Sequence, residues 1–379
     1  MSADGSAGAN STLLARLIGS LPEAVKLRLS DLGCPLDEST QIQVLSRGLS
    51  NQNYHLSRDN QHLVLRVNSQ ASSQISARDH EVANWRLAEV HGLAPALLYV
   101  APGNSCYLSR FIDTGEDWSR LMTANPAHPL QEECVSRPDA EVLLLDLLKG
   151  LAQLPLPKNP ISVTEQWRRY FGQLEMIAES LDAASTDKAS LDAVGSTDLP
   201  ISYLEPWKTR WQALKAHLVR VDDVLEQLNA CALAPQYSHR DLNPHNLLIS
   251  QGKLWCIDYE YACSSHPLVD LASVLATHRL SSEQRHRLIL GYLNDHPKLN
   301  DKALAAIPSA LALYWYFAAC WALLMASQGE GILKQTVQKT VLQSVEKTVP
   351  QTQGESDASL PHSVSDYLQC FDDFMVLVG

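Results

Sequence analysis

The sequence predicts an α+β protein in two lobes, a small β-rich lobe over residues 1–112 and a larger helical lobe over residues 113–379. Strand-like pieces are concentrated in the first third of the chain, and helical patterns fill most of the remainder. The chain has 379 residues, of which 45% are hydrophobic and 19% charged. That is enough for one large two-lobed fold, or two modest domains, with a sizeable core.

The predicted elements of the first lobe follow one another closely. A helix over Leu13–Leu32 follows a small, polar stretch, residues 1–12, that is typical of a loose terminus. A second helix over Ala77–His91 ends at Gly92, with Pro95 just beyond it. Five strands are expected, at Ile42–Leu45, Asn53–Ser57, His62–Val67, Ala96–Val100 and Cys106–Phe111.

Three segments of the second lobe differ in composition from the rest. Leu181–Pro200 is a mixture of Ser, Ala, Asp and Thr that is typical of an insertion, and residues 350–359 are similar. Ala303–Ala326 has no charge and is long enough to span a bilayer. Pro308, the dominance of alanine and the lack of flanking basic clusters favour a buried core helix instead.

The formal net charge of −12 argues against a nucleic-acid partner, because phosphate backbones bind basic surfaces. The same charge suits a cationic or neutral substrate better than an anionic one. The eight cysteines form no CxxC pair, and the first residues have neither the basic nor the apolar region of a secretion signal. We therefore expect a reduced, cytoplasmic protein without a membrane partner. The oligomeric state is left open.

The most informative stretch is Tyr237–Tyr261, YSHRDLNPHNLLISQGKLWCIDYEY. It predicts two strands, Asn246–Ser250 and Lys253–Ile257, joined by a tight turn at Gln251–Gly252. Polar side chains lie on both sides of this hairpin: His239, Asp241 and Asn246 before or at its start, and Asp258 after its end.

Phosphoryl transfer explains these residue types. An alcohol that attacks a phosphate must lose its proton, and the carboxylate of Asp241 is suited to accept it. Mg²⁺ prefers hard oxygen ligands, and the hairpin brings Asn246 and Asp258 together although twelve residues separate them. Asp and Asn are also common turn residues, so a loop without chemistry is the alternative for any one of them. The whole set in this order and spacing favours catalysis.

HRDLNPHN resembles the catalytic loop of the protein-kinase-like fold, with an Asn five residues after the Asp. The IDYEYA that follows is similar to the aminoglycoside phosphotransferase and choline kinase superfamily, and most like choline/ethanolamine and bacterial thiamine kinases. The resemblance covers about residues 44–277 and implies a protein-kinase-like two-lobed fold and an ATP- and Mg²⁺-dependent kinase.

Carried over by position, the resemblance makes Asp241 the catalytic base, and Asn246 and Asp258 the metal ligands. His239 would organise the loop. Three further residues match positions of the superfamily: Asn243 and Glu260 near the phosphate and acceptor sites, and Asp270 as an aspartate that braces the loop.

Residues 46–56, SRGLSNQNYHL, resemble the loop of this superfamily that covers the phosphates, often of the form G-x-S-N-x-x-Y. Backbone N–H groups and small side chains in such a loop can hold phosphate oxygens. The candidate nucleotide-binding residues are Gly48, Ser50, Asn51 and Asn53. An ordinary hairpin loop is the alternative, since the stretch contains one glycine.

Arg66 ends the strand HLVLRV, where protein kinases have a phosphate-binding lysine and choline-kinase-like proteins often have arginine. A guanidinium can reach phosphate oxygens while it pairs with a carboxylate, for which Glu81 is the candidate. A solvated surface pair is the alternative. The resemblance also implies that backbone groups near Ser109–Ile112 hold the adenine.

The acceptor is less well defined. A cationic acceptor favours aromatic faces and carboxylates. Tyr314, Phe317 and Trp321 fall on one face of a helix, and Glu260 adds negative charge. The same aromatics are equally typical of a core. The sequence thus indicates a kinase for a small alcohol of choline, ethanolamine or thiamine type. An aminoglycoside-like or other small-alcohol phosphotransferase, or a nucleotide-binding pseudokinase, is the alternative.

Overall fold

The computed structural model describes residues 4–45, 51–68, 78–124, 137–186, 201–328 and 363–378. The chain forms two compact units, of which the first comprises Met1–Thr123, Ser136–Asn159 and Tyr237–Cys263, and the second the rest. These units are not the two predicted lobes, and the predicted boundary between the lobes at residue 112 stays a prediction. The packing itself groups the catalytic-loop segment with the N-terminal sheet.

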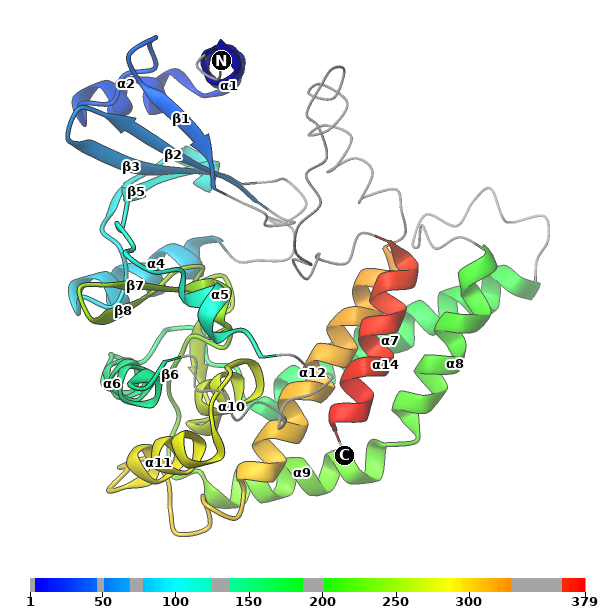
Figure 1. Ribbon diagram of the computed structural model, residues 1–379. Helices are drawn as coiled ribbons and strands as arrows, with labels where there is room; N and C mark the ends of the chain where they lie inside the picture. The colour runs from blue at the N-terminus through cyan, green and yellow to red at the C-terminus, as the bar shows by residue number, and fades with distance from the viewer. Residues whose placement is uncertain are drawn as a thin grey trace. The chain divides into compact units, whose positions relative to one another are not determined.

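The first unit is built on a five-stranded antiparallel sheet in the order β1-β2-β3-β5-β4 (Figure 1). The five strands agree with those predicted to within two residues at each end. Their bounds are β1 Gln41–Val44, β2 Asn51–Arg58, β3 Gln61–Asn68, β4 Leu97–Val100 and β5 Cys106–Arg110.

One face of this sheet packs against two helices, α1 (Asp4–Ser20) and α2 (Glu23–Asp31), through a shared apolar core. The prediction of one helix over Leu13–Leu32 is wrong, because the chain breaks at Pro22, which has no N–H to continue the helix. The prediction of a loose terminus is wrong from residue 4 onward. Asn10 of α1 ties the helix to the sheet, since its Oδ1 accepts from the amide of Ile42 at 2.8 Å.

The first unit also contains the predicted second helix and the hairpin predicted from the motif. Helix α4 (Arg78–Val90) is followed by Gly92, whose φ of 69° is the left-handed conformation that ends a helix. Strands β7 (Leu247–Ser250) and β8 (Lys253–Cys256) pair antiparallel, and the turn at Gln251–Gly252 has positive φ at both residues. The other short elements are η1 Pro102–Asn104, α5 Trp118–Met122, α6 Ala140–Ala152 and η3 Pro244–Asn246. Strands β6 (Gln236–Ser238) and β9 (Cys263–Ser265) lie where the chain passes between the units.

The second unit is helical in the part of the chain that the structure describes. Its helices are α7 Val163–Thr186, η2 Ile201–Tyr203, α8 Leu204–Lys215, α9 Leu218–Cys231, α10 Leu268–Thr277, α11 Ser282–Leu293, α12 Ile307–Ser327 and α14 Val364–Leu377. The predicted insertion over Leu181–Pro200 begins inside α7, and its residues after 186 lie outside the described part, as do residues 350–359.

Helix α12 contains most of the uncharged segment Ala303–Ala326, which is long enough to span a bilayer. Among the described residues it is the one helix long and apolar enough to cross a bilayer. It packs against α7, α9, α10 and α14 within its own unit (Figure 1), and twelve of its residues are buried. These contacts are those expected of the predicted core helix.

Acid should destabilise the second unit through His278, which is fully buried after α10. Burial lowers the pKa of His278 to about 3, whereas an unfolded histidine titrates near 6.5. The unfolded state therefore binds the proton first, and the stabilisation present above pH 6.5 is lost as the pH falls toward 3. Between pH 7 and 5 the free energy of unfolding should fall by about 2 kcal/mol more in the wild type than in His278→Gln.

Urea unfolding at the two pH values measures this difference. The exposed His286 lies nearby in α11, so His286→Gln is the matched control and should keep the wild-type pH dependence. Equal losses in the wild type and in His278→Gln would contradict the prediction.

Candidate active site

The hairpin β7–β8 positions the two predicted metal ligands. Asn246 directly precedes β7, and the ladder continues one step beyond the strands, since the amide of Ile257 donates to the carbonyl of Asn246 at 3.0 Å. Asp258 is the next residue, so both side chains come from the same end of the hairpin. Its φ of 65° is left-handed, a strained conformation for a non-glycine residue that is often found at functional sites.

Asp241 is held by two amide side chains from its own loop. Asn243 Nδ2 donates to its Oδ1 at 2.8 Å, and Asn246 Nδ2 donates to its Oδ2 at 2.7 Å and to its main-chain oxygen at 3.0 Å. Burial raises the pKa of Asp241 above its ordinary value, while the bond from Asn243 opposes the rise. The carboxylate is thus fixed in direction and is a stronger base than a solvated aspartate.

His239 is buried, and its Nε2 lies 3.1 Å from the carbonyl oxygen of Ile257. Its ring also meets Tyr259 edge-on, at 4.8 Å between centroids. Both contacts join the start of the candidate catalytic loop to the segment after β8, and the organising role of His239 stays a prediction. Between His239 and Asp241, Arg240 has a φ of 69°, so a left-handed turn directs the aspartate.

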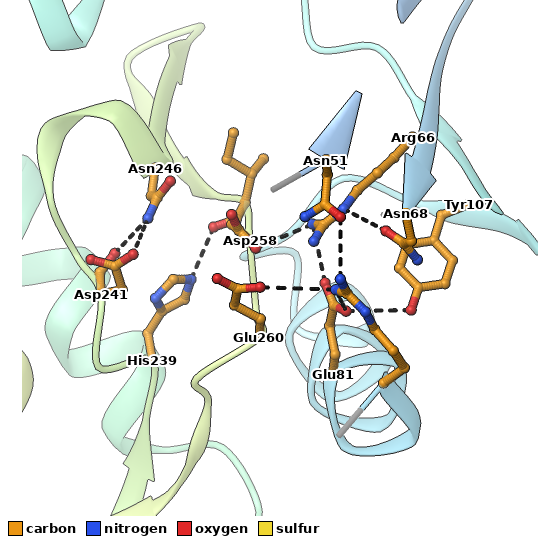
Figure 2. A network of polar contacts seen from close by, with 12 residues as sticks. Asn51, Arg66, Asn68, Glu81, Tyr107, His239, Asp241, Asn246, Asp258 and Glu260 are labelled. Carbon is orange, nitrogen blue, oxygen red and sulfur yellow. Dashed lines mark hydrogen bonds and ion pairs between the residues drawn. The ribbon is translucent and has the colours of Figure 1, made fainter. Parts of the chain in front are cut away.

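Arg66 and Glu81 form the predicted ion pair, and it is buried rather than on the surface. Arg66 Nη1 lies 3.1 Å from Glu81 Oε1 and 3.2 Å from Asp258 Oδ1, and the Glu81 side chain is 0% exposed (Figure 2). Burial lowers the pKa of Arg66, but the carboxylates of Asp258 and Glu81 outweigh it, so the net shift is upward. This pair brings the sheet, α4 and the hairpin end to one point.

The sequence did not predict Arg78, Tyr107 or Asn68, which complete this network. Arg78 Nη1 lies 2.6 Å from Glu81 Oε2, and the hydroxyl of Tyr107 donates to the same oxygen at 3.3 Å. Asn68 Oδ1 accepts from Arg66 Nε at 3.0 Å (Figure 2). Neither Arg78 nor Tyr107 lies in a recognisable sequence motif. The strand register, which places Tyr107 opposite Arg66, could have indicated Tyr107 but not Arg78.

Glu260 lies at the edge of the same network, 3.9 Å from Arg78 Nη1. Burial raises its pKa to about 7, helped by the nearby charge of Asp258 and opposed by that of Arg66. Glu260 therefore lies beside Arg78, and its predicted place near the phosphate and acceptor sites stays a prediction.

Asn246 and Asp258 suit a magnesium ion. The amide nitrogen of Asn246 is committed to Asp241, which leaves its oxygen, and Arg66 takes one oxygen of Asp258. One amide oxygen and one carboxylate are hard ligands of the kind Mg²⁺ takes when phosphates and water complete its shell. Among the described residues no cluster of three His, Cys, Asp or Glu offers another metal site.

The predicted nucleotide-binding residues are only partly described. Gly48 and Ser50 lie outside the described residues. Asn51 is buried at the start of β2, where its Oδ1 accepts from Arg78 at 3.2 Å. Asn53 is opposite Arg66 in the β2–β3 register, hence on the same face of the sheet.

Two backbone amides of the predicted adenine-binding linker already have hydrogen-bond partners within the protein. The amides of Arg110 and Phe111 already donate to the carbonyls of Ala96 and His62, at 2.9 and 3.3 Å. These two N–H groups are thus engaged within the protein, and any base contact near Ser109–Ile112 must use the other backbone groups there.

The predicted acceptor aromatics Tyr314 and Trp321 and the bracing aspartate Asp270 belong to the second unit, whereas Glu260 belongs to the first. Tyr314 and Trp321 are half-buried on α12, where Tyr314 meets Trp315 and Trp321 meets Tyr367 edge-on. Asp270 is buried in α10. Their predicted roles toward the catalytic loop stay predictions.

The family model of the phosphotransferase enzyme family (APH) matches residues 41–301, more than half of the chain. The chain belongs to this phosphotransferase family. Protein LicA of Haemophilus influenzae is 23% identical to this chain over 251 residues, which cover 66% of this chain and 62% of LicA. The match therefore spans less than two thirds of that relative.

Two solved kinases share the fold of this chain. Choline kinase LicA from Streptococcus pneumoniae is 14% identical, with a TM-score of 0.54 and coverage of 93% of this chain and 98% of the other. An ethanolamine kinase from Plasmodium vivax is 16% identical, with a TM-score of 0.53 and coverage of 82% and 83%. The predicted superfamily and the α+β kinase-like fold class are confirmed.

Replacing Glu81 with glutamine should destabilise the protein by about 3–5 kcal/mol, because two buried arginines lose their shared carboxylate. Glu89, on the same helix, makes a 2.8 Å pair with Arg86 that is partly exposed, so Glu89→Gln should cost less than about 1 kcal/mol. Urea unfolding of both variants measures the difference. Equal stability of the two would contradict the buried network.

Proposed function

We propose that this phosphotransferase moves the γ-phosphate of ATP onto the hydroxyl of a small alcohol, in the presence of Mg²⁺. The observation that supports this most strongly is the Asp241 carboxylate, which Asn243 and Asn246 hold in place, within the same unit as the Arg66–Glu81–Asp258 network. A fixed base and a fixed cation are the two components that phosphoryl transfer needs from a protein.

In this proposal each residue has one task. Arg66 binds phosphate oxygens, and its Nη2 is buried without a hydrogen-bond partner among the described residues, so a donor is left for an anion. Asp241 orients the acceptor hydroxyl and takes its proton as the oxygen attacks. Asn246 and Asp258 would hold Mg²⁺, which when bound neutralises charge on the transferring phosphoryl group.

For the acceptor we propose a cationic alcohol of the choline, ethanolamine or thiamine type. The IDYEYA motif, the net charge of −12 and the half-buried aromatics Tyr314 and Trp321 support this class. The two solved structures above are, by name, a choline kinase and an ethanolamine kinase. A cytoplasmic location is part of the same proposal.

An aminoglycoside-like acceptor is the second candidate, and one observation favours it. A cavity of about 560 Å³ in the first unit is lined by the carboxylates of Glu116, Asp117 and Asp139, together with Arg120 and Arg137. Clustered carboxylates suit a polycationic sugar. Arg137 already pairs with Glu116 and Asp139, however, which reduces the negative charge available to bind a cation.

Asp241→Asn should lower kcat by roughly 10²–10⁴-fold, because the amide cannot accept the proton, and should change ATP affinity little. ADP release with saturating acceptor measures turnover, and a thermal shift with MgATP reports binding. Asp223→Asn, at an exposed position on α9, is the control. Unchanged turnover in Asp241→Asn would remove this residue from the chemistry.

A panel of choline, ethanolamine, thiamine, homoserine and an aminoglycoside tests the acceptor class by acceptor-stimulated ADP release. Choline should react better than its neutral carbon isostere 3,3-dimethylbutan-1-ol, and Trp321→Leu should reduce that preference by roughly 2- to 30-fold. Trp315→Leu is the comparison on the same helix and should reduce the preference less, since Trp315 stacks on Phe374 and meets only Tyr314 of the predicted acceptor residues. Nucleotide binding without transfer to any acceptor would indicate a pseudokinase.

A further inference from the structure

Arg78 is a buried arginine in an unfavourable place. It begins helix α4, where the helix dipole is positive and opposes a cation, and its side chain is only 6% exposed. Ordering and burying a long charged side chain there costs free energy. Strong compensating contacts are therefore expected, and the structure provides them.

The guanidinium of Arg78 connects three segments of the first unit. It lies 2.6 Å from Glu81 on α4, donates to Asn51 Oδ1 at 3.2 Å, and is 3.9 Å from Glu260 beyond β8. Asn51 is one of the predicted nucleotide-binding residues of the stretch 46–56. Arg78 thus joins Asn51 of that stretch to the network around Arg66.

Glu81 divides its two oxygens between two arginines. Arg66 lies at Oε1, 3.1 Å away, and Arg78 lies at Oε2, 2.6 Å away. Glu81 is 0% exposed, so water cannot replace either arginine. If Arg66 turned toward a phosphate and Glu81 had no second partner, a buried carboxylate would be left unpaired at a large cost in free energy.

We infer that Arg78 is a positioning residue of the nucleotide site, which keeps Glu81 neutralised so that Arg66 can bind the phosphates, and which holds Asn51 of the predicted phosphate loop. The inference rests on the proposed function, since it assumes a nucleotide at Arg66. A purely structural role for Arg78 would affect stability but not nucleotide affinity.

The test is the dissociation constant of MgATP, measured by calorimetry, for Arg78→Met, Arg78→Lys and Arg86→Met. Arg86 is the matched control, because it pairs with Glu89 at the same i,i+3 spacing on α4 but is 45% exposed. Arg78→Met should weaken MgATP binding about tenfold or more, and Arg86→Met less than about twofold. The dissociation constant of Arg78→Lys should lie between those of Arg78→Met and the wild type, because lysine keeps the positive charge but lacks the planar guanidinium with its several N–H donors.

The double variant Arg78→Met/Glu81→Gln separates the mechanism from general damage. If Arg78 acts by neutralising Glu81, removing that charge should recover part of the affinity lost in Arg78→Met, so the two effects will not add. Additive losses would overturn the mechanism. Should Arg78→Met fail to fold, Arg78→Lys alone decides, and an affinity equal to that of Arg86→Met would overturn the inference.

The proposed function fails in a different way. If the wild type itself does not bind MgATP, the nucleotide proposal is wrong. If the wild type binds MgATP and both Arg78 variants bind it equally well, only the role of Arg78 is wrong.

Discussion

The first unit depends on one buried carboxylate. Glu81 is fully enclosed and takes an arginine on each oxygen, Arg66 from the sheet and Arg78 from the start of its own helix. Through Arg66 the same cluster reaches Asp258 beyond the hairpin. A charge with no access to water must be neutralised by neighbours, so the positions of the sheet, of α4 and of the hairpin end are constrained together.

The catalytic loop relies on short-range constraints of a different kind. Asn246 serves two purposes, because its amide nitrogen orients Asp241 and its oxygen remains for a cation. His239 attaches the loop to the segment after β8. The left-handed residues Arg240 and Asp258 direct the two carboxylates. Among the described residues, these are two of six non-glycine residues with positive φ, and Asp258 is the one to which we assign a chemical role.

Local chemistry explains which predictions succeeded. The hairpin β7–β8, its turn and the end of α4 at Gly92 follow from residue preferences that act over a few positions. Pro22 is a local signal too, and it breaks the first helix although the apolar pattern continues through it. Arg78 and Tyr107 could not be predicted, because their roles arise from contacts between segments far apart in the chain.

The sequence by itself determined the fold class, the family and the candidate catalytic loop, since a motif of fixed spacing on a hairpin leaves few arrangements for Asp241, Asn246 and Asp258. Only the tertiary structure decided that Arg66 and Glu81 are buried and that Arg78 completes their charge balance. The physical reason is that burial and charge neutralisation depend on every segment that packs around a group, whereas hairpins, turns and helix ends depend on neighbours in the chain.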